Sequence, residues 1–119
     1  MTLSIKTALL SIAAVSLLCA APLGCDIGGT VSCDFRDGSV NGPEPRCQER
    51  SGIQASSSFK AFCDGLQGKS IDGPCPDSPV LGCDISEVEG KVIDWYYAPK
   101  TEAEIQQQCE DDGGEIVNP

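Results

Sequence analysis

The chain has 119 residues, in which 18 acidic side chains outnumber 8 basic ones, for a net charge of −10 without any histidine. This negative charge argues against a nucleic-acid partner and against docking on anionic lipid headgroups, because each phosphate contact needs a lysine or an arginine. The absence of histidine excludes Ser-His and Cys-His catalysis and every His-ligated metal site.

The N-terminal segment has the layout of a signal peptide. Lys6 precedes a run from Ala8 to Ala21 that holds no ionised side chain. The run is too short for a spanning helix, which needs about 20 apolar residues. We therefore expect residues 1–24 to direct export and to be removed. Residues 25–30 then form a tether and residues 31–119 a single domain.

Two cleavage sites follow this segment. Pro22-Leu23-Gly24-Cys25 resembles the lipobox of bacterial lipoproteins, in which a small residue precedes the cysteine that becomes lipidated. Cleavage before Cys25 leaves six further cysteines, which can all pair. Cleavage after Ala21 leaves seven, so that one is unpaired in an oxidising compartment or joins two chains. The even number of further cysteines left by cleavage before Cys25 favours lipidation of Cys25. The alternative is a soluble secreted protein.

The six remaining cysteines indicate a domain held together by disulfide bonds. They are Cys33, Cys47, Cys63, Cys75, Cys83 and Cys109. Large apolar residues are few, and three disulfides of about 3 kcal/mol each would compensate for a thin core. Their spacing fits neither a zinc knuckle nor a redox Cys-x-x-Cys motif, so we expect no metal and no cofactor.

Two helices are predicted. The first is capped by Ser56 or Ser57, and its apolar stripe is expected to face the core. That stripe consists of Phe59, Phe62, Cys63 and Leu66. The second begins with a capping box, in which Thr101 and Glu104 satisfy each other's backbone N–H groups, and it ends at Gly113. Its predicted inner face consists of Ile105, Gln108 and Cys109.

Between the helices, residues 80–86 and 91–97 predict a hairpin that turns at residues 87–90. Alternation places Ile93, Trp95 and Tyr97 on one face, which we expect to point inward, and Tyr96 on the other. At least one ring is then expected to be exposed, either as a recognition patch or as the margin of a small core. Prolines 74, 76 and 79 make the preceding segment an irregular linker.

The domain divides into two halves that share an order: a cysteine, an acid and an apolar residue, then glycine and valine, then a helix ending at a cysteine five residues before a glycine. The first half has Cys33-Asp34-Phe35, Gly38, Val40, Cys63 and Gly68. The second has Cys83-Asp84-Ile85, Gly90, Val92, Cys109 and Gly114. We interpret this as a duplication, the alternative being chance among common residue types. The predicted fold is a small α+β domain of two strand-strand-helix units.

Six cysteines allow fifteen pairings, and the sequence does not select one. If the two halves are equivalent, Cys33 pairs with Cys63 and Cys83 with Cys109. Cys47 and Cys75 are then left to each other.

Acidic residues gather at two places. They are Asp84, Glu87, Glu89 and Asp94 in the hairpin and Glu110, Asp111 and Asp112 at the end of the second helix. Solvated surface charge is the main interpretation. The alternatives are a pair of carboxylates for glycoside hydrolysis, which needs a cleft, and a calcium site without the usual loop motif.

Several short motifs carry a resemblance. They are Phe62-Cys63, Cys75-Pro76, Gly82-Cys83, Trp95-Tyr96-Tyr97 and the segment from Cys109 to Gly114. With the signal and Cys25, they make the chain resemble the small cysteine-rich lipoproteins abundant in myxobacteria. The resemblance implies a cell-envelope lipoprotein held in a membrane by its lipid, and no activity. We expect a non-enzymatic structural or binding module with a protein partner. The alternative is a secreted disulfide-rich inhibitor or effector.

Overall fold

The computed structural model describes residues 29–87 and 89–119. The predicted signal peptide and Cys25 lie outside the described residues. The elements are β1 (Thr30–Asp34), β2 (Arg46–Ser51), a single 3-10 turn η1 (Gly52–Gln54), α2 (Ser57–Gly65), β3 (Lys69–Ile71), β4 (Leu81–Asp84), β5 (Lys91–Tyr96), α3 (Glu102–Asp111) and β6 (Glu115–Val117). β1 begins one residue before the predicted start of the domain.

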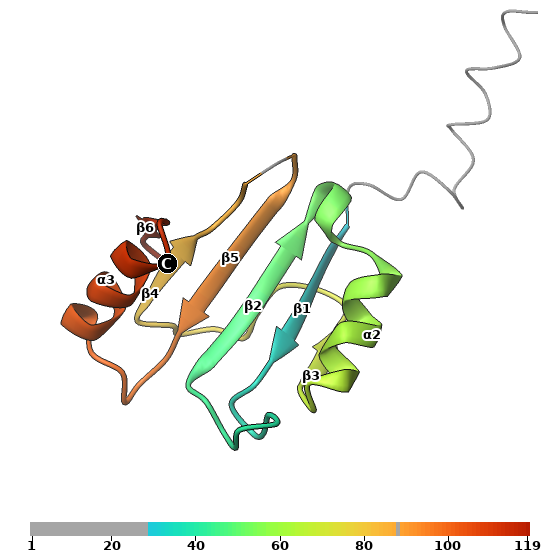
Figure 1. Ribbon diagram of the computed structural model, residues 1–119, viewed down its shortest axis with the longest axis horizontal. Coiled ribbons are helices and arrows are strands. Elements are labelled where there is room, and N and C mark those ends of the chain that lie inside the picture. The colour runs from blue at the N-terminus through green and yellow to red at the C-terminus, as the bar shows by residue number, and fades with distance from the viewer. Residues whose placement is uncertain (1–28, 88) are drawn as a thin grey trace, which may run out of the picture.

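The six strands form one antiparallel sheet in the order β3-β1-β2-β5-β4-β6 (Figure 1). The first three strands in this order come from the first half of the chain and the last three from the second. The two halves therefore meet where β2 pairs with β5. The predicted α+β class is confirmed, and each unit has a short third strand after its helix.

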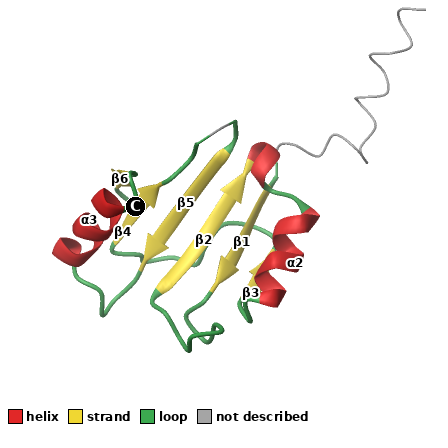
Figure 2. Ribbon diagram, viewed as in Figure 1, coloured by secondary structure: helices red, strands yellow, loops and turns green. Residues whose placement is uncertain are grey.

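Both helices lie on the same face of the sheet. Cys33 lies opposite Gln48, Gln48 opposite Asp94, and Asp94 opposite Cys83. Side chains directly opposite each other on neighbouring strands point to the same side. Because Cys33 is bonded to α2 and Cys83 to α3, that side is the helix side. α2 packs against β1 and β3, and α3 against β4 and β6, so the helices cover the two ends of the sheet (Figure 2).

Each helix encloses a small core of its own. The first core consists of Val31, Cys33, Phe35, Phe59 and Cys63, and the second of Leu81, Cys83, Tyr96, Ile105 and Cys109. Each core contains a disulfide that joins a strand to the helix above it. The thin apolar content of the chain is thus divided between two clusters, each closed by a covalent bond.

The linker between β3 and β4 crosses the opposite face of the sheet, behind the strands in Figure 1. It is fixed there by the disulfide between Cys47 and Cys75 and by the Cys75 N–H, which donates to Glu49 at 2.9 Å. Ser32 donates to the carbonyl of Gly73 at 2.7 Å. Both faces of the sheet are therefore covered in part, one by helices and the other by the linker.

The two halves repeat each other with a constant spacing of 46 residues from β2 onward. The spacing relates Phe59 to Ile105, both buried, and Cys63 to Cys109. It also relates Gly68 to Gly114. The N–H group of Gly68 donates to the carbonyl of Cys63 at 3.0 Å, and that of Gly114 donates to the carbonyl of Cys109 at 2.9 Å. These matches extend the duplication inferred from the sequence to backbone geometry.

One match within the predicted repeat is wrong. The sequence pattern pairs Gly38 and Val40 with Gly90 and Val92, but the structure places Val92 on a strand and Val40 in the loop between β1 and β2. The ladder shows that Arg46 is the counterpart of Val92, because Phe35 donates to the carbonyl of Arg46 as Ile85 does to that of Val92. The first loop is four residues longer, which displaces the sequence match.

The predicted inward face of β5 needs correction. Tyr97 is buried, but Ile93 and Trp95 are only half-buried because the linker, not a helix, covers their side. Asp94 and Tyr96 are buried on the helix side. None of the three neighbouring rings is fully exposed, contrary to expectation, because both faces of the sheet are covered.

The helix ends match prediction, whereas the helix faces match it only in part. Ser56 caps α2, the full capping box at Thr101 begins α3, and Gly113 has the left-handed φ of 74° that follows it. Phe62 is 51% exposed and Gln108 is also exposed. The helices lie at the ends of the sheet, where there is no neighbouring element to cover a wide stripe.

Candidate functional site

A polar groove runs over the middle of the sheet on the helix side. Its floor is formed by alternate residues of the two central strands, which lie between the two helices. These residues are Arg46, Gln48 and Arg50 of β2 and Val92, Asp94 and Tyr96 of β5. Alternation on two adjacent antiparallel strands brings all six to one surface. We name this surface the central groove.

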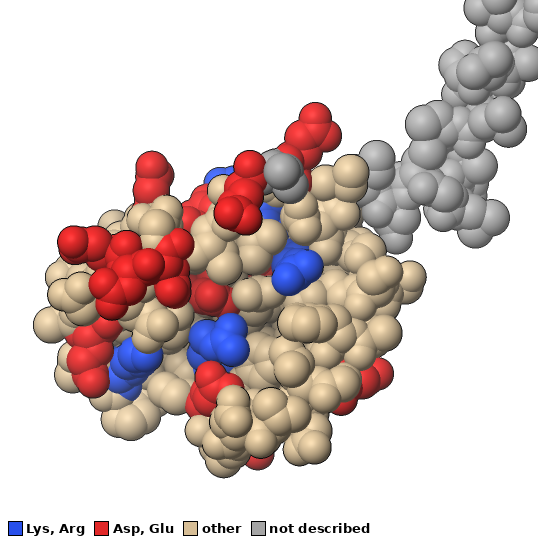
Figure 3. Space-filling model, viewed as in Figure 1, with Lys and Arg blue, Asp and Glu red and all other residues tan. Residues whose placement is uncertain are grey.

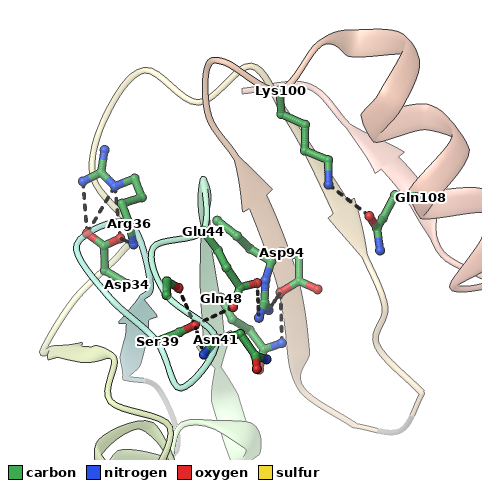
Figure 4. A network of polar contacts seen from close by, with 11 residues as sticks. Asp34, Arg36, Ser39, Asn41, Glu44, Gln48, Asp94, Lys100 and Gln108 are labelled. Atoms are coloured by element: carbon green, nitrogen blue, oxygen red, sulfur yellow. Dashed lines mark hydrogen bonds and ion pairs between the residues drawn. The ribbon is translucent and has the colours of Figure 1, made fainter.

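Asp94 holds the centre of the groove together. Its side chain is buried, and its Oδ1 accepts from Gln48 Nε2 at 3.0 Å and from Arg46 Nη1 at 3.2 Å. Arg46 also lies 3.6 Å from Glu44, which reaches over from the loop before β2 (Figure 4). A buried carboxylate is tolerated when it is paired and hydrogen-bonded in this way. Asp94 and Glu44 are thus engaged with Arg46.

Asp94 and Gln48 also mark the centre of the internal symmetry. They are 46 residues apart and directly opposite each other in the β2–β5 ladder. An approximate two-fold axis therefore passes between them, perpendicular to the sheet. The axis relates the two ends of the central groove.

A hollow lies at each end of the groove. The first, of about 270 Å³, is lined by Gln48, Arg50, Gln54, Ile85, Glu87 and Val92. The second, of about 250 Å³, is lined by Pro43, Glu44, Pro45, Arg46, Tyr96, Lys100 and Gln108. The repeat relates Arg50 to Tyr96 and Gln54 to Lys100, so the same backbone positions line both hollows with different side chains.

Cations lie over the aromatic rings at the margins of the groove. The guanidinium of Arg46 lies 4.5 Å from the Phe35 ring centre, and that of Arg50 lies 4.2 Å from the centre of Phe59. Lys100 Nζ lies 4.9 Å from the centre of Tyr96 and donates to Gln108 at 3.0 Å. Figure 3 shows basic side chains in a row across this face, with acidic ones gathered over α3 and along the upper edge.

Arg50 differs from the other two arginines in its partners. Arg36 is bonded to Asp34 through two nitrogens, and Arg46 is paired with Asp94 and Glu44. Arg50 Nε donates to Gln48 at 3.0 Å, and within residues 29–87 and 89–119 no carboxylate lies within 4.0 Å of it. Burial lowers the pKa of its guanidinium from the usual value, and the charge of Asp94 opposes that shift.

The six cysteines of the described domain form three disulfides. They join Cys33 to Cys63, Cys47 to Cys75 and Cys83 to Cys109, which are the three pairs given by the duplication. Cys25, the predicted site of lipidation, lies outside the described residues.

Trp95 lies in a separate hollow on the linker side. This hollow, of about 260 Å³, is lined by Glu49, Cys75, Pro76, Asp77, Ser78, Pro79, Trp95 and Pro119. Trp95 also covers Gly82, where an added Cβ would approach the indole to 2.7 Å. The ring therefore packs on a strand and is not part of the central groove.

The hairpin acids do not converge on the groove as a catalytic pair. Asp84 pairs with Lys91 at 3.4 Å and accepts from the Ser86 N–H, and these contacts hold its pKa below the usual value, the Ser86 bonds most strongly. Asp94 is on the helix side with Arg46. Among the described residues, no three His, Cys, Asp or Glu side chains are grouped closely enough to hold a metal ion.

Arg46, Gln48 and Arg50 were not among the residues that the sequence pattern indicated. The segment from Arg46 to Ser51 is almost wholly polar, so nothing in its hydrophobic pattern indicated a central strand. One signal was available: the segment lies 46 residues before β5, which was predicted correctly.

Comparison with known proteins gave no match to a protein-family model, a curated protein or a solved structure. In the part of the chain from Gly29 on, leaving out residue 88, no helix is long and apolar enough to cross a membrane.

Proposed function

We propose that this protein is an exported, lipid-anchored component of the bacterial cell envelope, and that it acts as a non-enzymatic binding module through the central groove. The observation that carries the proposal is the state of its cysteines. All six in the described domain are paired, five of them nearly inaccessible to solvent. Disulfides of this number are typical of proteins outside the reducing cytosol.

Complete pairing also supports the anchor. With six cysteines engaged in disulfides, Cys25 has no partner among them, and lipidation gives that thiol a defined role. The signal-like residues 1–24 and the lipobox-like residues 22–25 support the same route.

The groove supports a binding role. Its polar floor is fixed by the Asp94 hydrogen bonds, and the two strands that carry it lie between β1 and β4, each of which a disulfide joins to a helix. A site whose side chains are held before the ligand arrives loses less conformational entropy on binding.

Intact mass of the protein purified from its native membrane tests the anchor. We expect a chain that begins at Cys25, carries a diacylglyceryl or triacyl increment, and gains six hydrogens on reduction. The matched control is Cys25→Ser, which should lose both the lipid and membrane recovery and keep the same reduction shift. A lipid-free chain that begins at Pro22 would overturn the proposal and favour a secreted inhibitor or effector.

A further inference from the structure

The first hollow of the central groove holds an arginine that has no ion-pair partner among the described residues. Acidic side chains outnumber basic ones by more than two to one in this chain. Arg50 nevertheless has no carboxylate within 4.0 Å among the described residues, although Arg36 and Arg46 each have one at 3.2 Å or less. Among the arginines of the described residues, Arg50 alone has no such partner, and it is a partly buried one.

The surroundings of Arg50 orient its guanidinium toward a ligand. Its Nε is occupied by Gln48, and one face of its plane lies against the Phe59 ring. The two terminal nitrogens have no hydrogen-bond partner among the described residues, and Arg50 is one of the residues that line the hollow. Fixing the guanidinium plane in this way leaves a planar pair of donors, the arrangement that matches the two oxygens of a carboxylate.

The remaining lining of the hollow suits a carboxylate on a small organic group. Ile85 and Val92 supply apolar surface. Gln48 and Gln54 line the hollow with side-chain amides that are held by hydrogen bonds to Asp94 and to the Glu89 carbonyl. Polar anchors at one side and apolar walls at the other are the usual composition of a small-ligand site.

We propose that the hollow at Arg50 binds the carboxylate of a small organic acid or of a peptide C-terminus, with Arg50 as the anchoring residue. This inference rests on the binding role proposed above and specifies the ligand class. Glu87, on the margin of the same hollow, limits affinity, because its charge repels an incoming carboxylate.

The test is an NMR titration of the oxidised full-length protein in detergent, followed at the Arg50 Nε–Hε signal in the unmodified chain and, in the chain and every variant alike, at the backbone amide signals of Gln48 and Val92, which line the hollow. The probes are N-acetylglycine, its uncharged amide, and inorganic phosphate. We expect a saturable shift with N-acetylglycine alone. Arg50→Lys should weaken the binding about tenfold, because lysine keeps the charge and loses the paired donors. Arg36→Lys, a change in a fully paired arginine on the other face, should leave it unchanged.

A second variant keeps the test valid if Arg50→Lys does not fold. Glu87→Gln should tighten binding of N-acetylglycine several-fold, because it removes the repulsive charge without touching the core. A shift that does not saturate, an equal response to the amide, stronger binding of phosphate, or no change in either variant would overturn the proposal. The mass measurement tests the lipid anchor, and this titration tests carboxylate binding at Arg50. Either proposal can therefore fail without the other.

Discussion

The two halves of this molecule share a framework and differ in surface. Cys63 and Cys109, Gly68 and Gly114, and the buried Phe59 and Ile105 occupy equivalent places. The outer surfaces of the helices are unlike: α2 carries Lys60 and Asp64 and exposes Phe62, whereas α3 carries four acids and exposes Gln108 at the place of Phe62.

The difference shows which positions the fold constrains. The helix cysteines, the glycines beside the sulfur atoms and the buried apolar position of each helix are kept, whereas positions that face solvent or the groove differ. Arg50 and Tyr96 are equivalent in the framework, yet one is a cation without an ion-pair partner among the described residues and the other is a buried ring. A symmetric framework thereby carries an asymmetric site.

Removing one helix disulfide at a time is the strongest way to compare the halves. We expect the double variants Cys33→Ala/Cys63→Ala and Cys83→Ala/Cys109→Ala each to lose about 3.5 kcal/mol of unfolding free energy, measured with urea. The closed loops have sequence separations of 30 and 26, so the entropic effect is nearly equal. A difference above about 1 kcal/mol would show that packing, not loop closure, separates the halves.

The two framework glycines offer a second comparison. An added Cβ at Gly68 or Gly114 would lie 2.5 Å from the sulfur of Cys33 or Cys83. We therefore expect Gly68→Ala and Gly114→Ala each to lower the melting temperature and to cost about 2–3 kcal/mol. The control is Gly65→Ala within α2, where nothing lies within 4 Å, and it should be neutral or stabilising. If only one of these two alanine variants were destabilised, Gly68 and Gly114 would not be structurally equivalent.

Alkaline pH should lower the free energy of unfolding through two tyrosines that the second half carries and the first half lacks. Burial raises the pKa of Tyr96 and of Tyr97 to about 12, from 10.0, whereas their counterparts are Arg50 and Ser51. Between pH 10 and 12 the unfolded chain releases phenolic protons that the folded chain retains, so stability falls as pH rises. We expect a loss on the order of 2 kcal/mol per tyrosine.

Urea unfolding at pH 9 and pH 11.5 measures this loss. Tyr96→Phe should remove about half of the pH dependence. An unchanged slope would show that Tyr96 ionises as freely in the folded protein as in the unfolded chain.

The smallest expected effect concerns the residues after the helices. Gln67 and Gly113 are equivalent, with left-handed φ values of 64° and 74°. Because a side chain is strained there, Gln67→Gly should stabilise the protein by about 0.5–1 kcal/mol and Gly113→Gln should destabilise it by about 1 kcal/mol. Thermal unfolding under oxidising conditions measures both. If both substitutions stabilised the protein, or both destabilised it, Gln67 and Gly113 would not be equivalent left-handed positions.

Much of this architecture was predictable where local chemistry determines it. The Thr101 capping box and the β4–β5 hairpin depend on residues close in sequence, and the cysteine pattern was visible because the two halves repeat it. The burial of β5 was not predictable, since it depends on segments far away in the sequence. The linker covers one face of the sheet and the helices cover the other. The central groove was missed because β2 is polar, and its place in the middle of the sheet is set by pairing with β5.

The disulfides also divide the covalent structure. The rings closed by Cys33–Cys63 and Cys47–Cys75 overlap, and Cys83–Cys109 closes a third ring that shares no residue with them. Residues 76–82 belong to none of the three. One protease cut there would leave two fragments held together only by non-covalent contacts, chiefly the β2–β5 seam. Because the symmetry axis passes beside Gln48, β2 of one such fragment could pair with β2 of another in the same register, converting an internal repeat into a dimer.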